Sequence, residues 1–171
     1  MDEKKPSSLS KKPKVLIAED NPVVSKGLTE FLNKWGYTPV PVDNGDDALQ
    51  RLEEDHQIRL AIVDWNMPGL SGMQVCQRLR IRSGGPYVYI IMFSARKSKE
   101  EEILALDGGA DDYLVKPCKP SELRARIGVG RRIIETALTI QMNQNTPTAK
   151  TDTDEKKSKK NDSGDAEKGN K

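Results

Sequence analysis

The stretch AIVDWNMPGLSG, residues 61–72, decides how the rest of the sequence is interpreted. Its apolar start, residues 61–63, leads directly into Asp64, and a turn-rich segment follows at 66–69. A short apolar run bounded by turn residues is typical of a strand that is buried on both faces. Asp64 therefore either begins a loop, as Asp commonly does, or supplies a carboxylate to a site at the end of a sheet.

The same order, an apolar strand and then a helical pattern, occurs five times between residues 14 and 140. Strands are predicted at 14–18, 37–42, 60–63, 87–92 and 113–115, and helices at 22–35, 44–55, 73–81, 98–106 and from 120 onward. Strict alternation favours a parallel sheet with helices on both faces. In such folds ligand sites form beyond the carboxyl ends of the strands, where the strand order reverses.

The composition limits the broad class of protein. Of the 171 residues 35% are hydrophobic and 32% charged, so we expect residues 14–140 to form one domain and 1–13 and 141–171 to be disordered. A net charge of +2 is too small to argue for nucleic acid or membrane binding. Two cysteines, no secretory signal and no apolar span of membrane length predict a cytoplasmic protein.

The last predicted helix extends further than the sheet requires. Its inward stripe is expected to hold Leu123, Ile127, Ile134 and Leu138. Gly128 and Gly130 should weaken it by about 1 kcal/mol each relative to Ala and allow a kink. Its other apolar residues are available to contact a partner or a second copy of the chain.

Polar residues follow four of the five strands. They are Glu19 and Asp20 after the first strand, Asp64 after the third, Ser94 after the fourth and Lys116 after the fifth. If the first and third strands are neighbours, the three carboxylates converge. Two such charges at ~4 Å repel by about 4 kcal/mol at an effective dielectric constant of 20, so the cluster requires a cation. Oxygen ligands that leave room for water favour Mg²⁺ over Ca²⁺.

A carboxylate beside Mg²⁺, an ammonium group and a hydroxyl group is a suitable phosphoryl acceptor. Asp can act as a nucleophile and form an acyl phosphate, and phosphoryl transfer depends mainly on positioning and electrostatics. Each residue alone has a simpler explanation: Asp20 as a helix cap, Ser94 as a loop hydroxyl, Lys116 as a surface residue. Their coincidence at the ends of separate strands favours a functional site.

These motifs resemble those of a known family. The motifs IAEDN, VDWNMPGLSG, FSAR and GADDYLVKP, in this order over residues 14–139, resemble those of receiver domains of two-component response regulators. The resemblance implies a flavodoxin-like, doubly wound sheet of five parallel strands in the order 2-1-3-4-5. It further implies a stand-alone, CheY-like regulator that accepts a phosphoryl group from a histidine kinase or phosphotransfer protein.

The resemblance also assigns roles to individual residues. Asp64 is the phosphoacceptor. Mg²⁺ is bound by Asp20, by Asp64 and by the backbone carbonyl of Asn66, with Glu19 assisting through water. Ser94 and Lys116 contact the phosphoryl oxygens, Tyr113 is a switch residue together with Ser94, and the Lys116–Pro117 bond is cis, which only X-Pro bonds adopt at low cost. Asn66 and Arg96 occupy positions that tune dephosphorylation in the family.

The sequence allows more than one output and more than one function. The resemblance implies a protein partner on the face formed by residues 98–106, 113–115 and the last helix, and a dimer through that helix is another expectation. No element for direct nucleic acid contact is recognised. A remnant of a longer regulator, acting as a phosphate sink or scaffold, is the alternative. An Asp-nucleophile, Mg²⁺-dependent phosphatase would need an acid where Asn66 stands, and a flavin-binding module would need a phosphate loop. We expect no enzyme activity beyond the chain's own phosphorylation and dephosphorylation.

Overall fold

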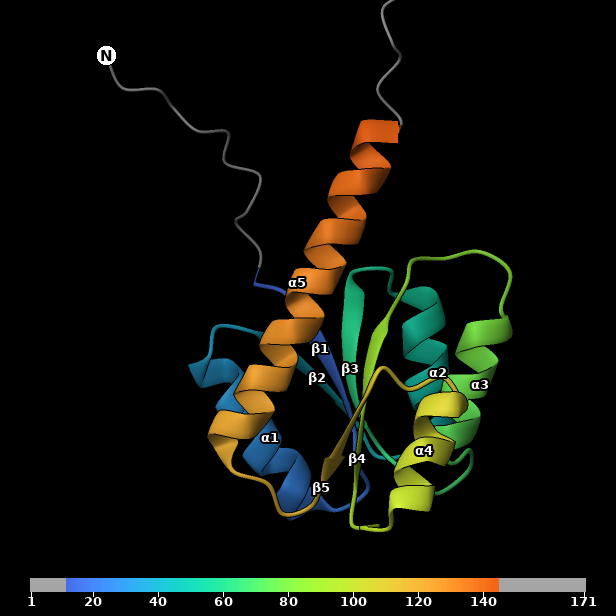
Figure 1. Cartoon of the computed structure of the whole chain (residues 1–171). Helices are drawn as coiled ribbons and strands as arrows, with labels where there is room; N and C mark the ends of the chain where they lie inside the picture. The colour runs from blue at the N-terminus through green and yellow to red at the C-terminus, as the bar shows by residue number, and fades with distance from the viewer. Residues whose placement is uncertain (1–11, 145–171) are drawn as a thin grey trace, which may run out of the picture.

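Five parallel strands alternate with five helices in residues 12–144, the part of the chain that the computed structural model describes (Figure 1). The strands are β1 Lys14–Ala18, β2 Thr38–Val42, β3 Ile58–Asp64, β4 Tyr89–Ser94 and β5 Asp112–Val115. The helices are α1 Pro22–Lys34, α2 Gly45–Glu54, α3 Gly72–Ile81, α4 Lys99–Asp107 and α5 Pro120–Gln144. The predicted elements are all present, with ends that differ by one or two residues.

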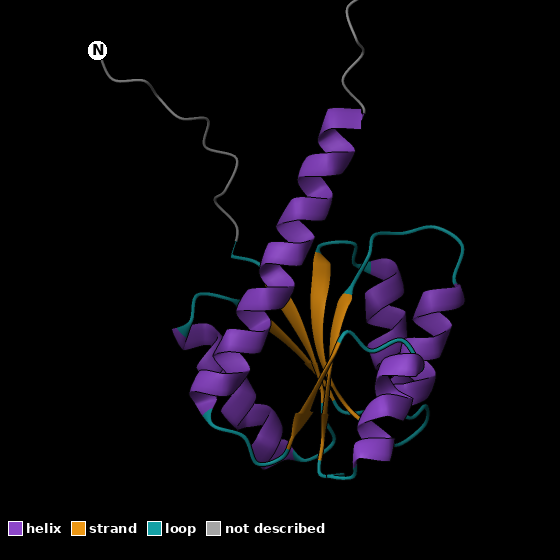
Figure 2. Cartoon of the chain, in the orientation of Figure 1, coloured by secondary structure: helices purple, strands orange, loops and turns teal. Residues whose placement is uncertain are grey.

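The sheet has the strand order β2-β1-β3-β4-β5, and every neighbouring pair is parallel. Helices α1 and α5 cover one face, and α2, α3 and α4 cover the other (Figures 1 and 2). The predicted flavodoxin-like fold is therefore confirmed. The strand order reverses between β1 and β3, which places the ends of these two strands side by side at the crevice where such folds form sites.

Two apolar cores explain why the strands read as continuous apolar runs. Alternate residues of each strand point to opposite faces. Ile17 and Ile62 pack toward α1 and α5, whereas Leu16 and Ala61 pack toward α2 and α3. β4 begins at Tyr89, two residues later than predicted, because Tyr87 is 43% exposed and belongs to the preceding loop.

The edge strand β2 is protected against further pairing. The Thr38 N–H donates to the Pro13 carbonyl (2.8 Å), and the Val42 carbonyl accepts from the Glu19 N–H (3.0 Å), so residues 38 and 42 face β1. Because strand residues alternate, Pro39 and Pro41 face the open edge, where they have no N–H to donate. Proline at such positions prevents another strand from adding to the sheet.

Helix α5 is one continuous helix of 25 residues, and its last turns extend away from the sheet (Figure 1). Leu123, Ile127 and Ile134 are buried as predicted, but Leu138 is 38% exposed, because it lies in the turns that extend away from the sheet. The helix passes through the predicted domain end at 140. Residues 1–11 and 145–171, most of the two segments predicted to be disordered, lie outside the described residues. No helix within 12–144 is long and apolar enough to cross a membrane.

Two glycines of α5 should respond in opposite ways to an added methyl group. A Cβ at Gly130 would lie 2.5 Å from the Tyr89 ring, whereas a Cβ at Gly128 would meet only Arg132, at 3.7 Å. Gly130→Ala should therefore lower the free energy of unfolding by about 1–3 kcal/mol through overpacking. Gly128→Ala should raise it by up to about 1 kcal/mol, because Ala favours the helix. Urea unfolding of both variants checks this; changes of the same sign would contradict the packing described.

Candidate functional site

The end of β1 delivers two acidic residues, and the residue after them begins α1. Oδ1 of Asn21 accepts from the N–H groups of Val23 (3.0 Å) and Val24 (3.3 Å), so Asn21 caps the helix. The explanation of Asp20 as a helix cap is therefore wrong. Among residues 12–144 none donates a hydrogen bond to the exposed Asp20 carboxylate, which leaves its oxygens available for a cation.

Asp64 is the last residue of β3, and the loop after it is held against both α2 and α3. The Gly72 N–H donates to the Trp65 carbonyl (2.9 Å), and the Gly45 N–H donates to the Pro68 carbonyl (3.1 Å). A Cβ at Gly72 would lie 2.1 Å from the carbonyl oxygen of Asp64. Only glycine permits this approach, which fixes the backbone on either side of the Asp64 carboxylate.

The predicted convergence of carboxylates is present. Glu19, Asp20 and Asp64 each offer a carboxylate oxygen, and these oxygens lie within 4.8 Å of one another. Glu19 is 3% exposed and Asp64 is 9% exposed. Burial of this kind strengthens the repulsion between like charges, because less water screens them.

Lys116 supplies the positive charge on the other side. Its Nζ lies 2.5 Å from Oε2 of Glu19 and 3.2 Å from Oδ2 of Asp64, and its side chain is only 17% exposed. The explanation of Lys116 as a solvated surface residue is therefore wrong. The Lys116–Pro117 peptide bond is cis, as predicted.

The net charge of the site is suited to a divalent cation. Three carboxylates and one ammonium group carry a net charge of −3 + 1 = −2. Burial raises the pKa of Glu19 above its usual value, and the hydrogen bond from Lys116 only partly opposes this. The backbone carbonyl of Asn66 accepts no hydrogen bond from any described residue, so it is available as a neutral ligand. An all-oxygen donor set of this kind fits Mg²⁺.

Ser94 ends β4 beside the end of β3, where Asp64 pairs with Phe93. The hydroxyl is buried, and its oxygen accepts from the N–H of Arg96 (3.2 Å). This contact is the one expected if Ser94 were simply a loop hydroxyl. It uses an acceptor position of the hydroxyl, and the Tyr113 hydroxyl lies close enough to interact with the same group.

Tyr113 lies in β5 with its ring turned into the protein. It is 8% exposed, and its hydroxyl donates to the backbone carbonyl of Arg96 (2.9 Å). The ring therefore already lies inward in this structure. The same hydrogen bond connects Tyr113 to the loop that follows Ser94.

The contacts of the Arg96 side chain were not predicted. Its guanidinium lies over the Trp65 ring, 4.9 Å from the centroid, and Nη1 lies 2.6 Å from Oε1 of Glu101 in α4. Nη2 lies 3.4 Å from Oδ1 of Asn66. A tryptophan directly after the strand-end Asp was the available sequence signal, but spacing alone does not reveal which cation would stack on it.

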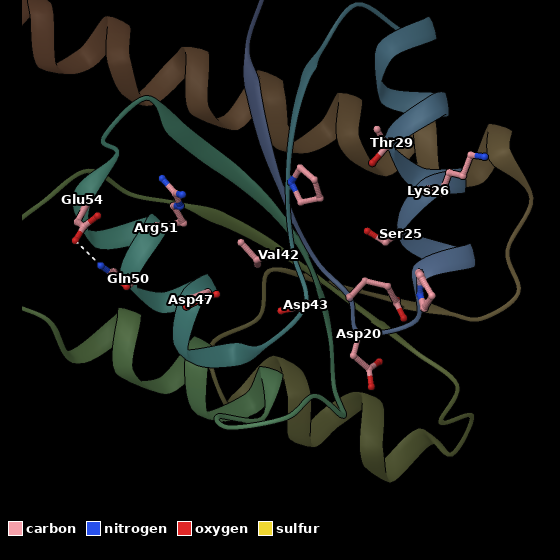
Figure 3. Close-up of a pocket in the computed structure, with 13 residues that line it drawn as sticks. Asp20, Ser25, Lys26, Thr29, Val42, Asp43, Asp47, Gln50, Arg51 and Glu54 are labelled. Atoms are coloured by element: carbon pink, nitrogen blue, oxygen red, sulfur yellow. Dashed lines mark hydrogen bonds between the residues drawn. The ribbon is translucent and has the colours of Figure 1, made fainter.

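A large polar groove includes two of the acidic residues of the site but not the rest of it. Its volume is about 900 Å³, and it lies between α1 and α2 along β2, with Glu19 and Asp20 among its lining residues (Figure 3). Asp64, Ser94 and Lys116 do not line this groove. Asp64 and Lys116 meet these two acidic residues at the crevice between β1 and β3.

Comparison with known proteins agrees with this geometry. The family model described as "Response regulator receiver domain" matches residues 15–128. The chain is 40% identical over 115 residues to the phosphate regulon transcriptional regulatory protein PhoB of Rhizobium meliloti, which covers 67% of this chain and 50% of that protein. It is 36% identical over 114 residues to the DNA-binding response regulator MtrA of Mycolicibacterium smegmatis, covering 67% and 48%. The chain thus spans about half the length of these curated relatives.

Solved structures show the same similarity. The receiver domain of Francisella response regulator 1452 is similar with a TM-score of 0.65 and 30% identity, covering 71% of this chain and 98% of that one. The BeF3-activated receiver domain of Klebsiella pneumoniae RstA is similar with a TM-score of 0.62 and 31% identity, covering 68% and 97%. Fold, strand-end residues and family match therefore agree: the chain belongs to the family of response regulator receiver domains of two-component signal transduction.

Proposed function

We propose that this chain accepts a phosphoryl group on Asp64 from a phosphohistidine of a sensor kinase or phosphotransfer protein. Receiver domains as a family interact with such proteins and generally bind Mg²⁺. The observation that carries the proposal is the position of the Asp64 carboxylate. It lies against the Lys116 ammonium group and within 4.8 Å of two further carboxylates, at the end of a buried strand.

In the proposed transfer, one carboxylate oxygen of Asp64 attacks the phosphorus atom. A P–O bond forms as the P–N bond breaks, and the departing imidazole nitrogen keeps the electron pair of the broken bond and takes up a proton. Lys116 neutralises charge on the transferred oxygens, and the Ser94 hydroxyl donates a hydrogen bond to one of them. In dephosphorylation, water attacks phosphorus and the P–O bond breaks, which restores the carboxylate.

Asp20, Asp64 and the Asn66 carbonyl would hold Mg²⁺, with Glu19 assisting through water. When bound, the ion neutralises negative charge on the phosphoryl oxygens. We further propose that the chain is not an enzyme toward other substrates. Position 66 is Asn, which offers no carboxylic acid to protonate a leaving group, so a phosphatase of the Asp-nucleophile type is disfavoured.

The phosphoryl signal is proposed to reach a protein partner at the α4-β5-α5 face. Ser94 and Tyr113 both hydrogen-bond to the backbone of Arg96. A movement of the Ser94 hydroxyl toward a phosphoryl oxygen would therefore displace the Arg96 backbone and, with it, the Tyr113 side chain. The face is rich in exposed apolar side chains, among them Ile103, Leu104 and Leu106 of α4. Apolar surface of this kind is suited to protein contact.

Beryllofluoride, a phosphoryl mimic, tests the proposal through Trp65. The Trp65 ring is 8% exposed and follows Asp64, so its fluorescence should report on the site. Trp35→Phe removes the second tryptophan and leaves Trp65 as the single reporter. In this background, beryllofluoride with Mg²⁺ should change the fluorescence, and Asp64→Asn should remove the change. No change, or an equal change in Asp64→Asn, would contradict the proposal.

A further inference from the structure

We propose that Arg96 is a latch that holds α4 to the unphosphorylated site and exchanges Glu101 for phosphoryl oxygens when Asp64 is modified. The inference rests on the proposed phosphorylation of Asp64. It adds a named contact that carries the change from the site to α4.

Arg96 is the residue at which the two loops of the site and α4 meet. Its side chain contacts Trp65 and Asn66 in the loop after β3 and Glu101 in the first turn of α4. Its backbone N–H donates to Ser94, and its carbonyl accepts from Tyr113. A displacement of the Arg96 side chain is therefore transmitted to α4 directly.

The guanidinium group has unused capacity to bind an anion. Nε of Arg96 is buried and has no hydrogen-bond partner among the described residues. The contact of Nη2 with Asn66 is long, at 3.4 Å. Arginine presents its donors as a planar fork that matches phosphate geometry, and charged oxygens are its strongest acceptors. A phosphoryl group on Asp64, the neighbour of Trp65, would offer such acceptors.

The present partner of the guanidinium is easily exchanged. The Arg96 and Glu101 side chains are 40% and 29% exposed, and partly exposed ion pairs are weak because water screens them. A phosphoryl group carries more negative charge than the single carboxylate of Glu101. The guanidinium stays stacked on the Trp65 ring during the exchange, which keeps the guanidinium near the site.

Helix α4 depends on this contact because little else anchors it. Ala105 is the one residue of α4 that is buried, and Ile103, Leu104 and Leu106 are 40–57% exposed. Loss of the Arg96–Glu101 pair would therefore loosen the first turn. Segments with few buried apolar contacts open most readily.

Glu101→Gln and Glu102→Gln form a matched pair for the test. Both remove one negative charge from the same turn of α4, but Glu102 pairs with Lys99 within the helix (2.9 Å) and not with Arg96. Without beryllofluoride, Glu101→Gln should speed hydrogen exchange in residues 99–107 roughly two- to fivefold. Glu102→Gln should leave it near the wild-type rate. Equal effects of the two variants on hydrogen exchange would contradict the proposed role of the Arg96–Glu101 pair.

Arg96→Gln tests the exchange of partners. In the wild type, Mg²⁺ and beryllofluoride should speed exchange in residues 99–107 as Glu101→Gln does. In Arg96→Gln exchange should already be fast, with no further change on beryllofluoride binding, which Trp65 fluorescence monitors separately. An unaltered α4 response in Arg96→Gln would overturn the proposal. Failure of the wild type to bind beryllofluoride would instead refute phosphorylation of Asp64, a distinguishable result.

Discussion

Asp64→Asn is expected to lower phosphorylation by a small-molecule donor by at least about a thousandfold, because the amide cannot act as the nucleophile. Acetyl phosphate with Mg²⁺ is a suitable donor, and the phosphorylated fraction can be read from the intact mass. The fold should remain, since Asp64 Oδ2 contacts Lys116 only at 3.2 Å and Glu19 retains its own contact with Lys116 at 2.5 Å.

Asp43→Asn is the matched control for the loss of one negative charge. Asp43 is an exposed acid in the adjoining groove and is not part of the carboxylate cluster. This variant should react at close to the wild-type rate. A similar loss in both variants would show that net charge near the site, and not the Asp64 nucleophile, determines the rate.

Lys116→Met is expected to lower the phosphorylation rate by about 10²–10³-fold, the usual effect of removing one electrostatic contact to a developing charge. It should also lower the free energy of unfolding at neutral pH by about 3 kcal/mol, because Glu19 would remain buried without its partner. Stopped reactions and urea unfolding measure the two effects separately.

The stability loss in Lys116→Met should depend on pH. Burial raises the pKa of Glu19, and the Lys116 hydrogen bond lowers it, so removal of Lys116 raises that pKa further. An acid whose folded-state pKa lies above its unfolded value loses stability as the pH rises through the folded pKa and regains it as the pH falls. The deficit of Lys116→Met should therefore shrink under mildly acidic conditions.

The double variant Glu19→Gln/Lys116→Met separates the two roles of the lysine. Gln removes the buried charge, so most of the stability should return, while the rate should stay low because the ammonium group is still missing. A double variant that reacts at the wild-type rate would mean that Lys116 serves only to neutralise Glu19.

The sheet and its site could be predicted from the sequence because both depend on local patterns. Strands covered on both faces must be apolar, and parallel strands all point their carboxyl ends toward the same edge. The polar residues at the carboxyl ends of β1, β3, β4 and β5 were therefore predictable as one group. Glu19, Asp64 and Lys116 do meet there.

What the sequence could not reveal depends on tertiary contacts. Leu138 follows the inward stripe of α5, yet it is 38% exposed, because the spacing of apolar residues does not show how far the rest of the protein covers the helix. Gly130 and Gly128 look alike in sequence, but only Gly130 faces the Tyr89 ring. The stacking of Arg96 on Trp65 likewise joins two loops. The number of residues between them in the sequence does not show that they lie together in the fold.

Chemical trapping of the acyl phosphate tests the central claim most directly. After reaction with acetyl phosphate and Mg²⁺, borohydride reduces an aspartyl phosphate to homoserine, and peptide mass mapping locates the altered residue. We predict reduction at position 64 alone, dependent on Mg²⁺ and absent in Asp64→Asn. Homoserine at any other aspartate, or an unaltered Asp64 in protein that carries the mass of a phosphoryl group, would contradict the account.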